Sequence, residues 1–198
     1  MWAIEELGLS YQRHDVGLMY GGNDTSEYLA MNPNGTVPTM RDDGGEPLFE
    51  SAAIIRYLGS KYGDAHFWPK ALEARTQVDV WTEWSKLNIA LKFTAPIFWL
   101  VVRTAPSQRN PEAIRRGLDV FEANLKIANG RLAQHDYLVG DVFTAADIVF
   151  GHVLYRYYDI DIERSNLPAV RAYYERLTKR PAFQKHVMVS YEELRVSD

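Results

Sequence analysis

The pattern of hydrophobic and polar positions changes character about a third of the way along the chain. Up to Tyr62, short apolar runs alternate with turn residues, which predicts small helices and strands in alternation. In the rest of the chain, apolar residues recur at helical spacing. The pattern therefore predicts an α/β domain over residues 1–62, a linker over residues 63–71 and an all-helical domain over residues 72–198.

The chain opens inside a helix. Its first residues are apolar at helical spacing, Gly8 suits the left-handed position after a helix end, and Leu9 can close that end by packing on Ile4. Residues 9–16 are predicted to form a β-strand. No Ser, Thr, Asp or Asn precedes the first helix as a cap, so we expect the natural protein to carry roughly 15–20 residues upstream of Met1.

Three further elements are expected before the linker. A capping-box spacing that begins at Asp24 predicts a short helix, and the turn sequence from Asp42 to Gly45 predicts a hairpin. Ser51 is placed to cap the helix that follows. In order, these elements are a helix ending near Met31, strands over residues 37–41 and 47–49, and a helix through Tyr62.

The helical half begins with a long helix from about Leu72 toward Arg103, in which Pro96 is expected to cause a kink or a break. A second helix starts at the Asn110 cap, because proline follows at the first helical position. Apolar residues along it alternate in steps of four and three, which is typical of a helix packed in a bundle: Ile114, Leu118, Phe121, Leu125, Ala128 and Leu132.

Thr144 and Asp147 have the spacing of a reciprocal helix cap, and Phe143 is placed to pack on Ile148. A buried acid at this place invites a catalytic assignment, but capping already accounts for it, so we assign Asp147 a structural role. A final amphipathic helix is expected over roughly residues 167–179.

Composition excludes several classes of protein. Hydrophobic residues make up 46% of the chain, which is too many for a disordered protein. The absence of cysteine excludes disulfides and thiol nucleophiles within these residues, and the five histidines lack metal-ligand spacing, so no metal is expected. A net charge of −4 argues against nucleic acid as a partner. No run approaches 18 apolar residues and no signal peptide is visible, so we expect a cytoplasmic protein that does not enter a membrane.

Two short segments carry candidate chemistry. The segment from Asn32 to Pro38 reads as a turn that leads into an extended strand, and the edge of that strand at Val37 can pair with an extended peptide. The second segment places Glu50 and Ser51 where a strand gives way to a helix. The free amides and positive dipole of a helix N-terminus bind carboxylates, while Glu50 offers a negative charge to an ammonium group. Together these groups can hold both charges of an amino-acid head group.

This arrangement, followed by a helical half, resembles the cytosolic glutathione transferases, and the resemblance covers nearly the whole chain. It implies a thioredoxin-like N-terminal domain, here without its first strand, and an all-helical C-terminal domain. It also implies a cis bond before Pro38, pairing of the Val37 main chain with the cysteinyl part of glutathione, and binding of the γ-glutamyl group by Glu50 and Ser51. Thr36 stands where many relatives carry a Lys that reaches the glycine carboxylate.

The resemblance leaves the catalytic residue unassigned. The family activates the glutathione thiol with a Tyr, Ser or Cys that follows its first strand, and no residue of this chain occupies that position. We therefore expect the activating residue upstream of Met1. Should the chain supply its own hydroxyl, Tyr11 and Tyr20 are the first candidates.

The resemblance implies a pocket for the second substrate between the two domains, lined by Phe98, Trp99, Arg103 and Tyr155. Arg103 follows Trp99 by one helical turn and can offer a cation to an anionic or nitro-bearing electrophile. An arginine favoured by the helix dipole is the alternative reading. The aromatic residues likewise fit an ordinary helical core.

The implied function is conjugation of glutathione, as co-substrate and without a further cofactor, to a small hydrophobic electrophile by a homodimer. Peroxide reduction and isomerisation on the same scaffold remain open. A competing class is a non-catalytic module of the same fold that serves protein association. The intact Val37–Pro38 and Glu50–Ser51 pairs favour a working ligand site.

Overall fold

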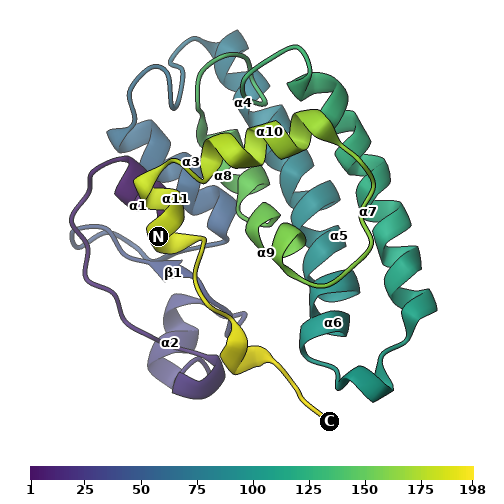
Figure 1. The fold of residues 1–198 in the computed structure, drawn as a ribbon. Coiled ribbons are helices and arrows are strands. Elements are labelled where there is room, and N and C mark those ends of the chain that lie inside the picture. Colours follow the sequence, from purple (N-terminus) through teal and green to yellow (C-terminus); the bar gives the residue numbers. More distant parts are fainter.

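Two β-strands form the whole sheet of this computed structural model, and every other regular element of residues 1–198 is helical (Figure 1). The strands pair antiparallel, with Thr39 opposite Phe49 and Met40 opposite Leu48. The elements of the first part are α1 (Trp2–Glu6), the 3₁₀ turn η1 (Leu18–Tyr20), α2 (Ser26–Met31), β1 (Thr39–Met40), β2 (Leu48–Phe49) and α3 (Ser51–Tyr62).

Most predicted ends of these elements are confirmed. Gly8 has φ +64°, and the amides of Gly8 and Leu9 donate to the carbonyls of Glu5 and Ile4, both at 3.0 Å, which closes α1 as expected. Helix α2 ends at Met31 as expected, but its cap is Thr25, one residue after the capping box expected to begin at Asp24, and the Thr25 hydroxyl accepts from the Tyr28 amide. The hairpin forms as expected, but its strands are shorter than the predicted 37–41 and 47–49, so Val37 and Pro38 lie just before β1 rather than within it.

Two predictions for this part are wrong. Residues 9–16 are not a strand, because a strand needs a neighbour for its backbone groups and the two strands present pair only with each other. Ser51 is the first residue of α3 rather than its cap. Glu50 takes the cap position, since β2 ends at Phe49 and the chain turns into the helix at once.

The helical part begins with one continuous run, Leu72–Val102, built from α4 (Leu72–Ser85), the π-helix η2 (Lys86–Ala90), α5 (Leu91–Phe93), the π-helix η3 (Thr94–Trp99) and α6 (Leu100–Val102). Pro96 lies inside η3, where the missing amide of proline interrupts the regular hydrogen bonding. This run is long and apolar enough to cross a membrane by length and composition, but its inward residues pack in the core of the helical part.

The remaining helices follow after η4 (Pro106–Gln108). They are α7 (Pro111–Leu132), α8 (Ala145–Gly151), α9 (Leu154–Asp159), α10 (Pro168–Leu177), α11 (Pro181–His186) and η5 (Glu192–Leu194). The Asn110 side chain caps α7, and the reciprocal cap of Thr144 and Asp147 opens α8, as predicted. Helix α11 was not anticipated, although proline at its first position is a recognised start signal.

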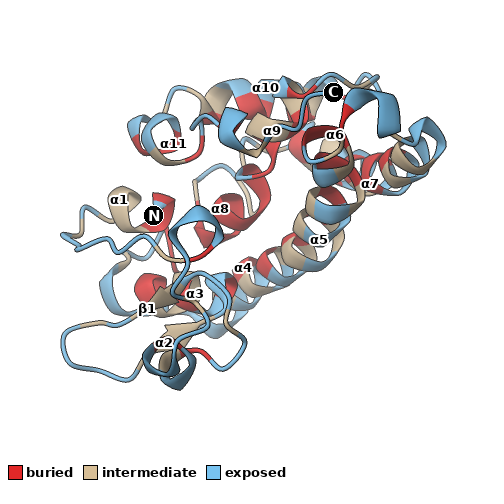
Figure 2. Cartoon of the chain, turned by 90° about the horizontal axis from the view of Figure 1, so that it is seen from below, coloured by how far each residue is buried: buried red, intermediate tan, exposed pale blue.

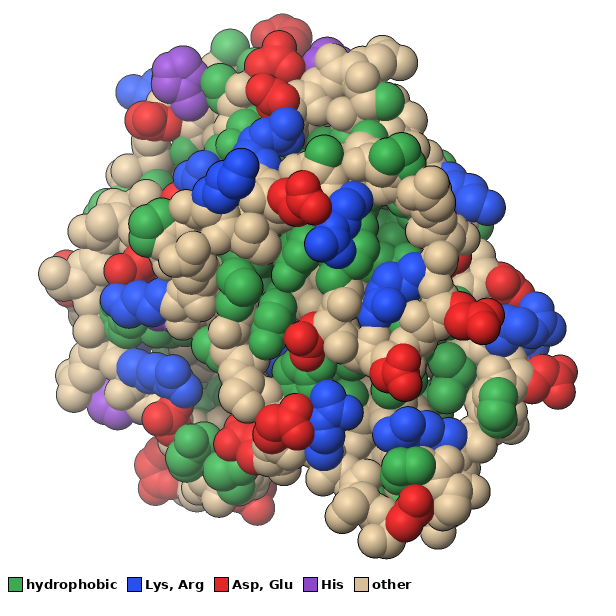
Figure 3. Space-filling model, viewed as in Figure 1, with side chains coloured by type: hydrophobic (Ala, Val, Ile, Leu, Met, Phe, Trp, Pro, Cys, Tyr) green, Lys and Arg blue, Asp and Glu red, His purple; other side chains and the backbone are tan.

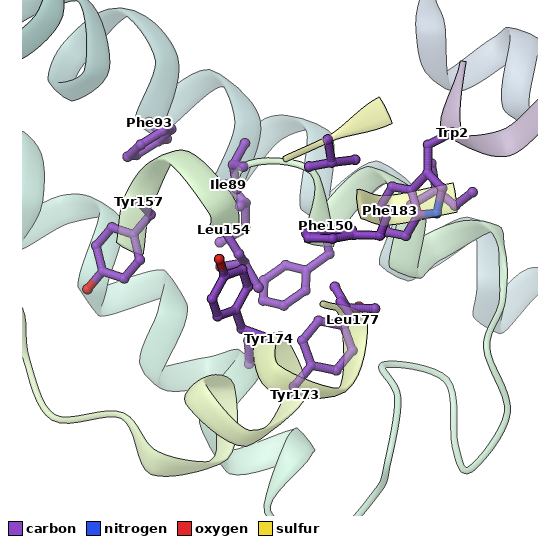
Figure 4. Packing of buried hydrophobic residues seen from close by; sticks show 14 of the residues in the cluster. Trp2, Ile89, Phe93, Phe150, Leu154, Tyr157, Tyr173, Tyr174, Leu177 and Phe183 are labelled. Carbon is purple, nitrogen blue, oxygen red and sulfur yellow. The ribbon is translucent and has the colours of Figure 1, made fainter. Parts of the chain in front are cut away.

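Helix α8 lies at the centre of the helical part, and all seven of its residues are buried (Figure 2). Aromatic rings fill the space around it: Phe150 lies 5.4 Å from Tyr173, and Phe93 lies 5.1 Å from Phe121 (centroid distances). The Trp2 ring, from α1, packs at 5.0 Å against Phe183 of α11 (Figure 4). The same apolar core therefore joins the first helix to the last ones.

Candidate functional site

The hairpin brings the two predicted binding segments to the same end of the sheet. Since Thr39 pairs with Phe49, one further step in this antiparallel register places Pro38 opposite Glu50. The dipeptides Val37–Pro38 and Glu50–Ser51 therefore leave the hairpin side by side. The peptide bond between Val37 and Pro38 is cis, as the resemblance to the glutathione transferases implied.

Buried polar side chains hold the turn that precedes Val37. The hydroxyl of Tyr28 and the side-chain amide of Asn32 both donate to the Thr36 carbonyl at 2.7 Å. Asn23 donates to the Gly35 carbonyl, also at 2.7 Å. Val37 itself is 54% exposed, and neither its N–H nor its carbonyl makes a hydrogen bond. Its main chain is thus open to an extended peptide.

Glu50 and Ser51 lie at the uncapped end of α3. Glu50 has φ +69°, a conformation that is costly for a residue with a side chain. No side chain caps the helix, and the amides of Ser51, Ala52 and Ala53 have no acceptor. These free amides give the end of the helix a positive potential beside the Glu50 carboxylate.

A lysine of the helical part reaches this end of α3. The ammonium group of Lys86 lies 2.7 Å from Oε2 of Glu50. Sequence reasoning did not identify Lys86 as a site residue. The only signal was its spacing of seven and three residues from Asp79 and Glu83, which places the three residues on one helix face.

Asp42 fixes the hairpin to the far end of α3. Its carboxylate accepts hydrogen bonds from Lys61, Tyr57 and Tyr62, each at 2.7 Å for Oδ2. The Lys61 ammonium group, and then the two tyrosine hydroxyls, lower the pKa of Asp42 to about 2. Both ends of the hairpin are therefore tied to α3, one by these bonds and the other by direct continuation into the helix.

The residues predicted to line the second pocket separate into two groups. Phe98 has no exposed surface and packs 5.1 Å from the Tyr191 ring, so it belongs to the core rather than to the wall of a pocket. Tyr155, partly buried, lies 6.3 Å from Tyr191. Trp99 is 43% exposed, and the Arg103 guanidinium lies 5.1 Å from its ring centroid. The structure pairs Trp99 with Arg103 but shows no contact between them and Tyr155.

Figure 3 shows hydrophobic side chains in a hollow at the middle of one face, with charged side chains around it. Two cavities lie beside the linker. One of about 220 Å³ is bordered by His66, Val78 and Thr144, and another of about 310 Å³ is bordered by Glu6, Asp64 and Arg180. Neither cavity contains a predicted binding residue.

No group of three His, Cys, Asp or Glu side chains is arranged to hold a metal ion. The two tyrosines considered as activators, Tyr11 and Tyr20, are exposed, and neither hydroxyl is hydrogen-bonded. The end of the hairpin thus offers a charged side chain and free main-chain groups for binding a peptide-like ligand.

Comparison with known proteins agrees with this geometry. Residues 1–61 match the family described as glutathione S-transferase, N-terminal domain, and residues 93–181 match the corresponding C-terminal domain. Glutathione S-transferase GstB of Escherichia coli K12 is 33% identical over 187 residues, which are 94% of this chain and 89% of that protein.

Two solved structures extend the comparison. The theta class glutathione S-transferase of Xanthomonas axonopodis pv. citri, crystallised with glutathione bound, has a TM-score of 0.89 at 41% identity, covering 96% of this chain and 90% of that one. Glutathione S-transferase I of maize, in complex with an atrazine glutathione conjugate, has a TM-score of 0.80 at 26% identity, covering 93% and 87%. With both family domains in order and a thioredoxin-like half before a helical half, the chain belongs to the glutathione S-transferase family.

Proposed function

We propose that this glutathione transferase joins the thiol of glutathione to small apolar electrophiles at the end of the hairpin where Val37 and Glu50 lie. One observation carries the proposal: the unpaired main-chain groups of Val37, an uncapped helix end and a carboxylate occur together there. These groups match an extended tripeptide that carries an amino-acid head group. The related enzyme of Xanthomonas axonopodis, with glutathione bound, supports the same ligand.

The cysteinyl residue and the γ-glutamyl group of glutathione each have an assigned partner. The main chain of Val37 pairs with the cysteinyl residue, the Ser51 hydroxyl and the free amides of α3 bind the γ-glutamyl carboxylate, and Glu50 binds the ammonium group. Thr36 and Pro38 flank Val37 and set the course of its main chain, and the Thr36 carbonyl accepts a hydrogen bond from Tyr28. Thr36 also leaves the glycine carboxylate without the lysine seen in many relatives.

The reaction requires the thiolate of glutathione. The sulfur attacks the electrophilic carbon, the new C–S bond forms, the leaving group departs with its electron pair, and the thiol proton passes to solvent. At an ordinary pKa of about 8.5 only a few per cent of the thiol is ionised near pH 7. The residues assigned above act by binding and orienting glutathione, which raises the effective concentration of the thiol at the electrophile.

The electrophile is proposed to lie against Trp99, Arg103 and Tyr155. Trp99 and Tyr155 present aromatic surface that is not fully covered, and Arg103 places a cation 5.1 Å from the Trp99 ring centroid. The maize relative supports an apolar second substrate, since its bound ligand is a glutathione conjugate of atrazine.

A homodimer is part of the proposal. Exposed apolar side chains recur at helical spacing on two helices that pack together, Val80, Leu87 and Leu91 on the long run and Val120 and Ile127 on α7. An apolar face of this kind favours burial against a second copy. Sedimentation equilibrium tests this directly, since a monomer at micromolar concentration contradicts it. A cytoplasmic location belongs to the same proposal and is tested by cell fractionation.

The activity is tested with a panel of aryl halides, epoxides, isothiocyanates and hydroperoxides, each assayed with and without glutathione. We expect glutathione-dependent loss of at least one apolar electrophile, with a stoichiometric S-conjugate identified by mass spectrometry. Turnover of hydroperoxides alone assigns the chain to peroxide reduction instead. Tight glutathione binding without turnover of any compound favours a non-catalytic role.

A further inference from the structure

The contact between Lys86 and Glu50 crosses from the helical part to the proposed glutathione site. Lys86 lies at the C-terminal end of α4, where the regular helix passes into the π-helix η2. Its ammonium group is 2.7 Å from Oε2 of Glu50 and makes no other ion pair. Both side chains remain partly open to solvent, at 32% for Lys86 and 54% for Glu50. The pair is therefore accessible to a ligand.

This pair is not needed to hold the two helices together. Arg56 of α3 already binds two carboxylates of α4, those of Asp79 at 2.6 Å and Glu83 at 2.9 Å. The two helices run antiparallel, so the pair of Lys86 and Glu50 lies beyond the Arg56 contacts, toward the start of α3 and the end of α4. The Arg56 contacts thus position Lys86 at the end of α3, and its own pairing with Glu50 is an additional feature.

An exposed ion pair contributes little to stability. It does match a zwitterion, because the head group of an α-amino acid carries one ammonium and one carboxylate on the same carbon. Such a head group can enter between the two side chains. The ion pair between Lys86 and Glu50 is then replaced by two ion pairs with the ligand, one from Lys86 to its carboxylate and one from Glu50 to its ammonium group.

We propose that Lys86 is a specificity-determining residue of the glutathione site, where it binds the γ-glutamyl carboxylate while Glu50 binds the ammonium group. Ser51 and the free amides of α3 share that carboxylate with Lys86, since Ser51 adjoins Glu50. In this way the helical part contributes a charge to a site otherwise built by the first part. This inference rests on the proposed glutathione binding and adds the residue that recognises one of its two carboxylates.

The test combines Lys86→Met with glutathione analogues that lack one charge of the head group. Glutaryl-cysteinyl-glycine lacks the ammonium group, and 4-aminobutyryl-cysteinyl-glycine lacks the γ-glutamyl carboxylate. The Kd of each ligand is measured by calorimetry on the full chain. Lys92→Met is the matched control, because Lys92 is an exposed lysine six positions along the same run with no ion pair. Thermal melting of each variant checks that it is folded.

We expect Lys86→Met to weaken glutathione and glutaryl-cysteinyl-glycine by about tenfold, the size of one hydrogen bond to a charged group. Binding of 4-aminobutyryl-cysteinyl-glycine should be nearly unchanged, Lys86→Arg should retain most of the affinity, and Lys92→Met should match the wild type. Equal losses for all three ligands assign Lys86 a merely structural role and overturn the inference. Unchanged or tighter glutathione binding also overturns it, since Lys86 then only competes for Glu50. Failure of the wild type to bind glutathione is a different result, because it rejects the proposed function itself.

Discussion

The guanidinium group of Arg180 binds the carboxylate of Glu6 through two hydrogen bonds, 2.8 Å from Nε and 2.6 Å from Nη2, between residues 174 positions apart. The indole N–H of Trp2 donates to the same carboxylate at 2.8 Å. The Arg180 guanidinium also lies 3.8 Å from the ring centroid of Phe143. Glu6 is largely buried, so this contact fixes α1 to the helical part.

Replacement of Glu6 by Gln leaves Arg180 partly buried without a counter-ion. We expect a loss of about 2 kcal/mol in the free energy of unfolding, measured by urea denaturation, because a shielded charge then lacks its partner. Glu175→Gln is the control: it removes an exposed i,i+4 pair with Arg171 and should cost less than about 0.5 kcal/mol. Equal losses in the free energy of unfolding would show that the Glu6–Arg180 contact stabilises the fold no more than an exposed ion pair does.

Asp147 is expected to matter for folding and not for catalysis. It is fully buried and accepts hydrogen bonds from the amide and hydroxyl of Thr144, the amide of Leu138 and the hydroxyl of Tyr173. Burial raises the pKa of Asp147, and these hydrogen bonds oppose that rise. Asp147→Ala should lower the free energy of unfolding by about 3 kcal/mol, since several buried donors lose their acceptor. The fraction that folds should keep the wild-type kcat/KM, and a specific loss of kcat in folded protein contradicts this assignment.

Local signals in the sequence predicted these contacts unevenly. The caps at Asn110 and Thr144 were predictable because each depends on residues three positions apart, whereas the cap of α2 is Thr25, one residue after the capping box expected at Asp24. The strand expected over residues 9–16 was not found, since strand formation depends on a distant partner that local pattern does not reveal.

The candidate site shows the same division. Val37, Pro38, Glu50 and Ser51 were identified from short motifs, and the hairpin register places them together. Lys86 was missed because it is 36 positions from Glu50, and only the tertiary fold brings the two side chains together. Phe98 and Trp99 are neighbours in sequence, yet only the packed structure shows that Phe98 faces the core while Trp99 faces solvent.

Acid should weaken the attachment of the hairpin to α3. The pKa of Asp42 is lowered from 3.8 to about 2, so the native state holds this carboxylate deprotonated where the unfolded chain takes up a proton. The stability due to Asp42 is therefore complete above the unfolded pKa and is lost as the pH falls from about 4 toward 2. In urea denaturation across this range, Asp42→Asn should show a shallower decline in stability than the wild type. Parallel declines would mean that Asp42 does not contribute to the acid response.

Tyr155 is proposed to contact the electrophile and not glutathione. Tyr155→Ala removes partly exposed aromatic surface on α9, so the KM for an apolar electrophile should rise several-fold, as expected for the loss of roughly 1–2 kcal/mol of apolar contact. The KM for glutathione should remain within about twofold, a change of only about 0.4 kcal/mol. Steady-state kinetics with each substrate varied in turn separates the two effects. A rise confined to the KM for glutathione would contradict the assignment of Tyr155 to the electrophile and place it at the glutathione site.

The central claim is that glutathione binds at the hairpin end formed by Val37, Pro38, Glu50 and Ser51. Its most direct test is a calorimetric titration of glutathione into the wild type, Ser51→Ala and Ser60→Ala, where Ser60 is an exposed serine farther along α3. We predict one glutathione per chain for the wild type and for Ser60→Ala, and about tenfold weaker binding for Ser51→Ala, which loses a hydrogen bond to a carboxylate. Equal affinity of Ser51→Ala and Ser60→Ala, or no binding by the wild type, would contradict the account.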